Sequence, residues 1–270
     1  MDKITVITLT RGRRELLKRA IASVYFQDYI GYIDHLIIID DCIETFKDLC
    51  GIESTSRRRL IPHFESRSTE EMTDRSARLD LVYPRIARLL NVGIHIADSR
   101  WIAFLDDDNE YEANHLSSLV DCAVQNNCSA VHSFRRIFQA DGTPYLDRHF
   151  PWARNPEEGE QIYESMCSRG VWIRNSNILK DRAGPSGLAP FKNSTILSAR
   201  DPVFLVDTSV WLLERSLLMR YPVPEVFSRE DLQNNTAPDD KLLELLLENK
   251  IPIVSSGLPT LRYYLGGISN

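Results

Sequence analysis

The stretch Trp101-Ile102-Ala103-Phe104-Leu105-Asp106-Asp107-Asp108-Asn109 places three consecutive carboxylates directly after five apolar residues. The apolar run is typical of a short buried strand, and a strand that ends in acids carries them to a sheet edge, where open α/β sheets bind ligands. On an extended chain Asp106 and Asp108 would share a target while Asp107 faced the other way. Like charges this close are costly unless a cation lies between them, and carboxylate oxygens suit Mg²⁺ or Mn²⁺, with substrate phosphate completing the shell. The alternative explanation is a solvated acidic turn.

The length of 270 residues is long for one domain but within the range that single α/β domains reach, and a hydrophobic fraction of 43% allows a sizeable core. A net charge of −6 argues against general nucleic-acid binding. The sequence contains no apolar run long enough to cross a bilayer and no signal-peptide layout at its start, so we expect no transmembrane segment. Five cysteines without a paired Cys-x-x-Cys spacing predict reduced thiols in a cytoplasmic protein and disfavour zinc.

The first forty residues predict a βαβ unit. The β-branched run Ile4–Leu9 is followed by the break Thr10–Arg13, by an amphipathic helix, and by a second apolar strand, His35–Ile39, that ends at Asp40-Asp41. Strands joined in this way lie parallel, so their ends should meet at the edge where Asp106 and Asp108 emerge.

Asp40 and Asp41 therefore have two explanations. An acid at the end of the second strand often accepts hydrogen bonds from a ribose or base, whereas the alternative is a polar turn. No Gly-x-Gly-x-x-Gly follows the first strand and no P-loop motif occurs, which argues against nicotinamide binding and against a P-loop enzyme.

The rest of the chain predicts further alternating elements. Tyr83–Ala97 should be a helix on which Arg85 and Arg88 lie three residues apart and could meet phosphate, although Arg85 is better explained as a solvated surface residue. The other expected elements are a minor strand at 60–64, a helix at 111–125, a strand at 131–138, a loop at 151–159, and a strand pair or strand into helix at 203–214. Residues 181–202 lack periodicity, and we interpret them as an acceptor-side lid.

Four blocks of this sequence together resemble the nucleotide-binding half of a family 2 glycosyltransferase of the GT-A fold. They are Ile4–Thr10 with Arg13, Leu36–Asp41, Asn91-Val92-Gly93 and Trp101–Asn109. The resemblance covers roughly the first 120 residues. It implies an α/β fold, a Rossmann-like three-layer α/β/α sandwich with a mostly parallel central sheet. It also implies a single domain, 1–270, in which 1–109 bind a nucleotide-diphosphate sugar and 110–270 bind the acceptor.

The same resemblance implies roles for individual residues. Asp106-Asp107-Asp108 would be the family's Asp-x-Asp motif, with Asp108 and Asp106 holding Mn²⁺ or Mg²⁺. Two departures stand out: Leu90 occupies the position of the family's usual Arg, with Arg88 the nearest substitute, and Thr-Arg-Gly-Arg follows the first strand where Tyr-Asn is commoner. The residues implied to bind the nucleotide sugar are Thr8, Thr10, Arg13, Asp40, Asp41, Arg88, Asn91, Asp106 and Asp107.

A second acidic pair opens the Leu-rich segment that begins at Ala237-Pro238-Asp239-Asp240. Proline followed by acids is typical of a helix start, so either acid could simply cap the helix. The resemblance instead implies that Asp240 is the catalytic general base and Asp239 its neighbour. Glu230-Asp231 is a competing acidic pair, and Asp207-Thr208-Ser209 resembles the family's acceptor-side segment.

The resulting hypothesis is a metal-dependent glycosyltransferase that moves a sugar from a nucleotide-diphosphate donor, with UDP favoured, to an acceptor hydroxyl. A single displacement with inversion, assisted by an Asp base, is what the family implies. A glycan, a lipid-linked sugar or a small-molecule aglycone would each be compatible as acceptor, as would a homodimer or a peripheral position at a membrane. The rival hypotheses are a sugar-phosphate nucleotidyltransferase and a non-catalytic module that binds nucleotide sugars or glycans.

Overall fold

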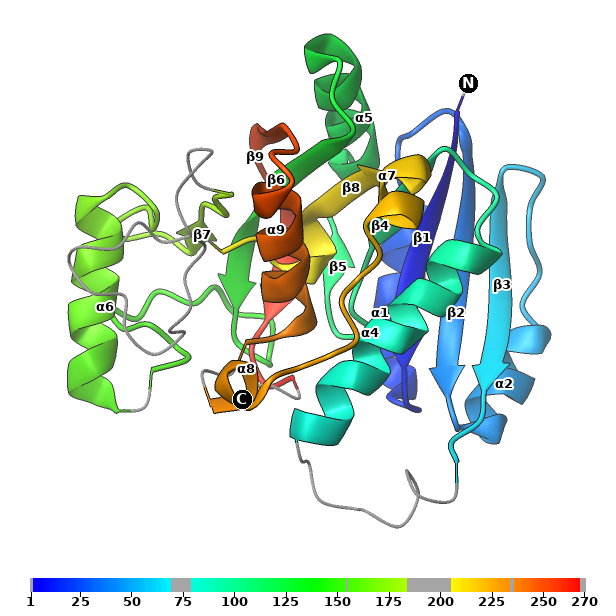
Figure 1. Cartoon of the computed structure of the whole chain (residues 1–270), viewed down its shortest axis with the longest axis horizontal. Helices are drawn as coiled ribbons and strands as arrows, with labels where there is room; N and C mark the ends of the chain where they lie inside the picture. Colours follow the sequence, from blue (N-terminus) through cyan, green and yellow to red (C-terminus); the bar gives the residue numbers. More distant parts are fainter. Residues whose placement is uncertain (1, 69–78, 154, 184–204, 234–235, 268–270) are drawn as a thin grey trace.

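A mixed β-sheet runs through the molecule, and helices cover both of its faces (Figure 1). The computed structural model describes all residues except 1, 69–78, 154, 184–204, 234–235 and 268–270. The strand order is β3-β2-β1-β4-β8-β6-β9-β5, with β7 paired to β6. The strands are β1 (Lys3–Thr10), β2 (Tyr32–Asp40), β3 (Arg58–Glu65), β4 (Trp101–Phe104), β5 (Glu110–Tyr111), β6 (Ala130–Phe138), β7 (Ile178–Leu179), β8 (Trp211–Glu214) and β9 (Ile253–Tyr264).

The helices form the two outer layers. In Figure 1, α4 and α9 cross the near face of the sheet, with α7 beside them, whereas α1, α2 and α5 lie behind it and α6 packs at the side near β7. None of the helices in the described ranges is long and apolar enough to cross a membrane. The helices are α1 (Arg14–Tyr25), α2 (Ile43–Cys50), α4 (Leu79–Ile96), α5 (His115–Asn126), α6 (Pro156–Ser168), the 3-10 turn η1 (Thr208–Val210), α7 (Arg215–Arg220), α8 (Arg229–Gln233) and α9 (Pro238–Glu248).

The first half of the sheet is parallel, as the βαβ pattern predicted. β2 pairs in parallel with β1 and β3, and β4 pairs in parallel with the other side of β1. The carboxyl ends of these strands therefore open at one edge, which we call the site edge. The predicted α/β fold with a mostly parallel sheet is confirmed.

The second half of the sheet delivers later segments to this same edge. β8 runs antiparallel to β4, with Leu212 opposite Ala103, so the residues just before β8 lie beside the acids that follow β4. β9 runs parallel to β6 and starts opposite Ala130, at the far end of the sheet. Because α9 leads directly into β9, the helix must begin at the site edge and run away from it.

Several local predictions need correction. Residues 151–159 are not all loop, because Asn155 accepts a hydrogen bond from the Glu158 backbone N–H at 2.9 Å and caps α6, which begins at Pro156. The helix predicted from Tyr111 begins only at His115, since Glu110 and Tyr111 pair with β9. For the 203–214 segment, the strand-into-helix alternative is the one observed, because β8 ends at Glu214 and α7 begins at Arg215. The proposed lid at 181–202 lies, beyond residue 183, outside the described residues.

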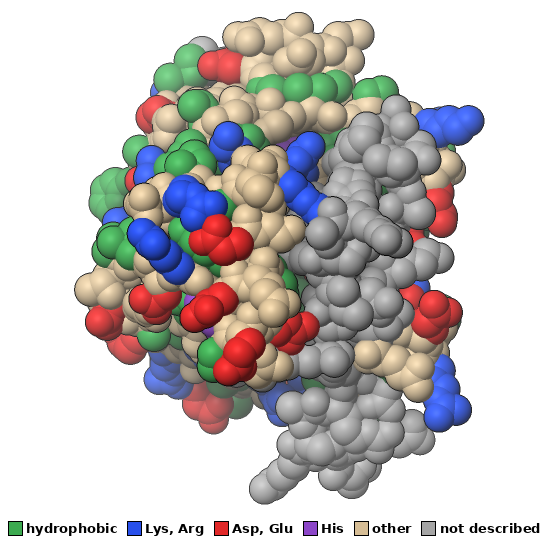
Figure 2. Space-filling model, turned by 90° about the vertical axis from the view of Figure 1, so that its left-hand side faces the viewer, with side chains coloured by type: hydrophobic (Ala, Val, Ile, Leu, Met, Phe, Trp, Pro, Cys, Tyr) green, Lys and Arg blue, Asp and Glu red, His purple; other side chains and the backbone are tan. Residues whose placement is uncertain are grey.

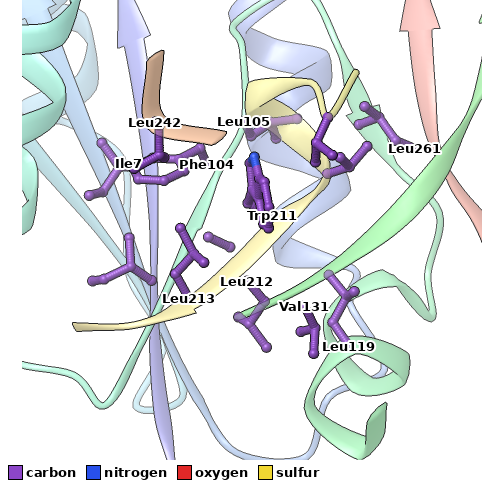
Figure 3. Packing of buried hydrophobic residues seen from close by; sticks show 14 of the residues in the cluster. Ile7, Phe104, Leu105, Leu119, Val131, Trp211, Leu212, Leu213, Leu242 and Leu261 are labelled. Carbon is purple, nitrogen blue, oxygen red and sulfur yellow. The ribbon is translucent and has the colours of Figure 1, made fainter. Parts of the chain in front are cut away.

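The core is continuous between the two halves of the sheet. Figure 3 shows Trp211 among Phe104, Leu105 and Leu261, and the Trp211 side chain is fully buried. Gly93 allows α4 to lie close against β1, because a Cβ at this position would come within 2.8 Å of Ile7 Cγ2. Gly93 of the Asn-x-Gly block is therefore needed for the packing of α4 against β1.

We predict that Gly93→Val lowers the free energy of unfolding by at least about 2 kcal/mol, because overpacking a rigid core forces strand and helix apart. Gly51→Val is the matched control, since a Cβ there meets only the Asp48 carbonyl at 3.8 Å, and it should cost less than ~1 kcal/mol. Urea denaturation of both variants provides the comparison. Equal losses would show that the close approach of α4 to β1 is unimportant.

Candidate functional site

Asp107 is held by the loop that follows β1. The Thr10 hydroxyl donates to Asp107 Oδ2 at 2.6 Å, and the Arg13 guanidinium binds both Asp107 oxygens through Nε and Nη2. Burial raises the pKa of Asp107, while the charge of Arg13 and the bonds from Thr10 and Arg13 oppose this. Thr10, Arg13 and Asp107 thus form one unit at the site edge.

Asp108 shares Arg13 with Asp107, which differs from the alternation expected of an extended chain. Arg13 Nη1 donates to Asp108 Oδ2 at 2.7 Å. The reason is that β4 ends at Phe104 and the backbone then turns, with the Asn109 N–H donating to the Asp106 carbonyl at 3.1 Å. The C-terminal segment passes close by, because a Cβ on Gly267 would lie 2.8 Å from Asp108 Oδ2.

Asp106 faces a different set of groups. The Ser209 hydroxyl donates to Asp106 Oδ2 at 3.0 Å and accepts from the Asp106 backbone N–H at 3.0 Å, and Asn109 Nδ2 donates to the same carboxylate at 3.3 Å. Burial, followed by the charges of Asp207 and Asp108, raises the pKa of Asp106 well above its usual value. The carboxylate therefore lies in a region of concentrated negative charge.

Behind Ser209 lies a buried ion-pair cluster centred on Arg135 of β6. Arg135 Nε and Nη2 lie 3.1 and 3.0 Å from the two oxygens of Asp181, and Nη1 donates to Asp207 Oδ2 at 2.8 Å. Asp207 Oδ1 accepts from the Ser209 backbone N–H at 2.9 Å and so caps η1. Burial alone would lower the pKa of Arg135, but the charges of Asp181 and Asp207 raise it, so it stays charged.

The predicted acidic pair Asp239-Asp240 lies at the start of α9, beside this cluster. The Asp240 carboxylate accepts the Ala237 backbone N–H at 3.0 Å, so the capping role expected from the sequence is present. Burial raises the pKa of Asp240 to about 6. Burial and the charges of Asp240, Asp207 and Asp106 raise the pKa of Asp239 well above its usual value.

The acids after β4 offer a partial set of ligands for a divalent cation. Asp106 and Asp108 supply hard oxygen donors, and their mutual repulsion is the kind of strain that a cation relieves. Within the described residues, no group of three or more His, Cys, Asp or Glu side chains is arranged as a metal site. The residues therefore fit an ion that takes two protein carboxylates and completes its shell with water and phosphate.

Asp40, at the end of β2, forms ion pairs with two arginines. Arg85 donates to Asp40 Oδ1 from Nη2 at 2.8 Å, and Arg67 pairs with both oxygens through Nε and Nη2. Burial opposes ionisation, but the hydrogen bond of Arg67 and the charges of Arg85 and Arg67 hold the pKa of Asp40 below its usual value. The expectation that Arg85 is solvated was wrong: it is 7% exposed, because the buried Asp40 requires a partner. Asp41, at a positive φ of 57°, accepts the Arg67 backbone N–H at 3.4 Å.

The surroundings of three other residues predicted to contact the donor are as follows. Thr8 is fully buried, and its hydroxyl hydrogen-bonds to His35 Nε2 at 2.9 Å. Asn91 binds the backbone of Val223 through both its Nδ2 and Oδ1 atoms. Arg88 is exposed on α4. Their roles in binding a donor stay predictions.

Arg135, Asp181 and Gly267 were not identified from the sequence, and Asp207 and Ser209 were assigned only to a segment. Asp207-Thr208-Ser209 carries a helix-cap signature that could have singled out Asp207 and Ser209. Arg135 gave no signal, because an arginine within a predicted strand can be paired only after distant acids have been placed.

Figure 2 views the side of the molecule that lies to the left in Figure 1. Over the described part of this face, acidic and basic side chains are interspersed and do not separate into fields of one sign. The surface charge on this side therefore gives no support to nucleic-acid binding.

Comparisons with known proteins concern the family and the fold of the chain. The glycosyl transferase family 2 model matches residues 84–181, which include most of α4, all of β4 and the three acids. No curated protein matches the sequence. Among solved structures, residues 1–349 of TarS from S. aureus match with a TM-score of 0.50 at 12% identity, over 97% of this chain and 60% of that one.

Two complexes of the same TarS fragment give similar values. The UDP complex matches with a TM-score of 0.51 at 11% identity over 99% of this chain and 62% of that one. The UDP-GlcNAc complex matches with a TM-score of 0.51 at 13% identity over 98% and 59%. The chain thus spans about 60% of the length of these fragments, and at such identities the likeness concerns the fold. The chain therefore resembles family 2 glycosyltransferases over residues 84–181 and shares the α/β fold of the TarS structures along nearly its whole length.

Proposed function

We propose that the protein transfers a sugar from a nucleotide-diphosphate donor, with UDP as the favoured nucleotide, to an acceptor hydroxyl. The observation that carries this proposal is the convergence of four segments at the site edge. They are the loop after β1, the acids after β4, the turn before β8 and the start of α9. Carboxylates gathered from distant parts of a chain at high free-energy cost are typical of a functional site.

The donor half of the site is built from Asp106, Asp107 and Asp108. A divalent ion at Asp106 and Asp108 would neutralise the charge that grows on the departing diphosphate. Arg13, which contacts both Asp107 and Asp108, lies where it can add positive charge next to that group. The TarS complexes with UDP and UDP-GlcNAc support the choice of UDP for this fold.

The proposed general base is Asp240. An acceptor hydroxyl is a weak nucleophile, so a carboxylate must accept its proton while the oxygen attacks the anomeric carbon and the bond to the diphosphate breaks. Asp240, with a pKa of about 6, is ionised at neutral pH and can accept that proton. The pKa of Asp239 is raised well above its usual value, which favours its protonated form and suits it less to this role. A base opposite the leaving group gives inversion.

The proposal assigns donor binding and acceptor binding to successive parts of the chain. Residues 1–109 would bind the donor and residues 110–270 the acceptor, whose identity is left open between a glycan, a lipid-linked sugar and an aglycone. Asp207 and Ser209, although in the second part, contribute to the donor side through Asp106.

Donor binding can be tested by calorimetric titration of UDP, GDP and dTDP, with and without MnCl₂. We expect UDP to bind most tightly with Mn²⁺ present and Asp108→Asn to weaken that binding at least about tenfold, the effect of losing one charged contact. Asp98→Asn is the control, because Asp98 is exposed and pairs with Lys3 at the opposite end of the sheet. Failure of all three diphosphates to bind would contradict the proposal, and turnover of a nucleoside triphosphate with release of pyrophosphate would favour a nucleotidyltransferase.

The role of Asp240 predicts a pH dependence. Because the base must be ionised, hydrolysis of UDP-GlcNAc, with water as acceptor, should fall about tenfold per pH unit below about 6 and level off above it. Asp240→Asn should lower kcat by about 10²–10⁴-fold while UDP still binds. Asp239→Asn should have the smaller effect on kcat. The opposite ranking of the two variants would transfer the base role to Asp239.

A further inference from the structure

We propose that Arg135 and Asp181 are positioning residues of the donor site, which act through Asp207 and Ser209 to hold the Asp106 carboxylate in place. This inference rests on the proposed function and adds two residues to it. Neither side chain is in hydrogen-bond contact with the three acids after β4. Their effect would therefore be transmitted through a defined series of contacts.

The series begins in the interior. Arg135 and Asp181 are 2% and 1% exposed, and they come from β6 and from the segment after β7. The guanidinium donates from Nε to Asp181 Oδ2 at 3.1 Å and from Nη1 to Asp207 Oδ2 at 2.8 Å, and its Nη2 lies at ion-pair distance, 3.0 Å, from Asp181 Oδ1. The planar fork of Arg fixes the orientation of both acids, which the ammonium group of Lys cannot do.

Asp181 makes a second contact that locks the next residue in the series. Asp181 Oδ1 accepts the backbone N–H of Asp207 at 3.1 Å, so both the main chain and the side chain of Asp207 are fixed. Residues 181 and 207 are also drawn together by the neighbouring bridge between Arg182 and Leu205, in which each N–H donates to the other's carbonyl at 2.9 and 3.0 Å. The turn before β8 therefore has one defined geometry.

From Asp207 the contacts lead to the donor acids. Asp207 Oδ1 accepts the Ser209 N–H at 2.9 Å, and the Ser209 hydroxyl both donates to Asp106 Oδ2 and accepts from the Asp106 N–H, each at 3.0 Å. Ser209 is fully buried, so its hydroxyl cannot change partners by turning to solvent. Loss of Asp181 would free Asp207, and Ser209 would no longer hold Asp106 in a single orientation.

Aromatic rings enclose the cation of this cluster. The Arg135 guanidinium carbon lies 5.2 Å from the ring centre of Tyr263 and 5.8 Å from that of Trp152. Exclusion of water strengthens the ion pairs and also raises the cost of breaking them. The cluster is therefore rigid, as a positioning device must be.

The test measures UDP affinity in saturating MnCl₂ for Asp181→Asn, Arg135→Lys and Ser209→Ala. We expect each variant to bind UDP at least fivefold more weakly than wild type, and the double variant Asp181→Asn/Ser209→Ala to bind no more weakly than the worse single variant. This non-additivity identifies one route, whereas a general loss of stability would not produce it. Circular dichroism at the titration temperature selects variants that remain folded, and Arg135→Lys serves if Asp181→Asn does not fold.

The matched control is Asp34→Asn. Asp34 is 3% exposed and pairs with Lys3 and Arg59, but it lies near the start of β2, away from the site edge. The Asp34→Asn variant should lose stability, as Asp181→Asn should, while its UDP affinity stays within twofold of wild type. Two results would overturn the positioning role and leave the proposed function intact. One is that Asp181→Asn binds UDP within twofold of wild type. The other is that the double variant loses UDP affinity by the product of the two single-variant factors. If wild type itself binds no UDP, the proposed function fails and the inference with it.

Discussion

Repulsion among the carboxylates after β4 is the constraint on which the rest of this structure depends. Three consecutive acids at the end of a buried strand cannot all be ionised without partners. The chain divides them between two sets of contacts. Asp107 and Asp108 receive Arg13 from the loop after β1, whereas Asp106 receives Ser209 and Asn109 and keeps a pKa well above its usual value. Of the three acids, Asp106 would therefore be stabilised most by a bound cation, because neither Ser209 nor Asn109 carries a positive charge.

The sheet topology explains how so many segments reach these acids. The parallel strands β1, β2 and β4 end at one edge, the antiparallel β8 starts there, and α9 begins there because it must return the chain to the start of β9. Each segment carries its polar residues at the end that faces this edge. Under the proposed function, the donor would bind on the side held by arginines and the acceptor beside the Asp239-Asp240 pair.

Much of this arrangement could be predicted from the sequence, because local patterns carry it. The apolar run before Asp106 and the strand–helix–strand spacing of the first forty residues required the acids and Asp40 to share an edge. Arg135 and Arg85 could not be placed in the same way. Each is buried only because an acid far away in the chain, Asp181 or Asp40, lies opposite it, and such pairing depends on strand order and register. By contrast, the start of α6 at Pro156 could have been predicted, because Asn155-Pro156-Glu157-Glu158 combines a capping Asn, a first-turn Pro and first-turn acids.

In the proposed function, the diphosphate of a nucleotide sugar binds at the acids after β4 together with a divalent ion. Anomalous diffraction at the manganese edge, from crystals grown with UDP and MnCl₂, tests it most directly. The account predicts a manganese peak within coordination distance of Asp108 or Asp106, bridged to the UDP phosphates, with the Asp240 carboxylate on the opposite side of the space left for the sugar. Bound UDP without a peak at these acids, or with its diphosphate elsewhere on the sheet edge, would contradict it.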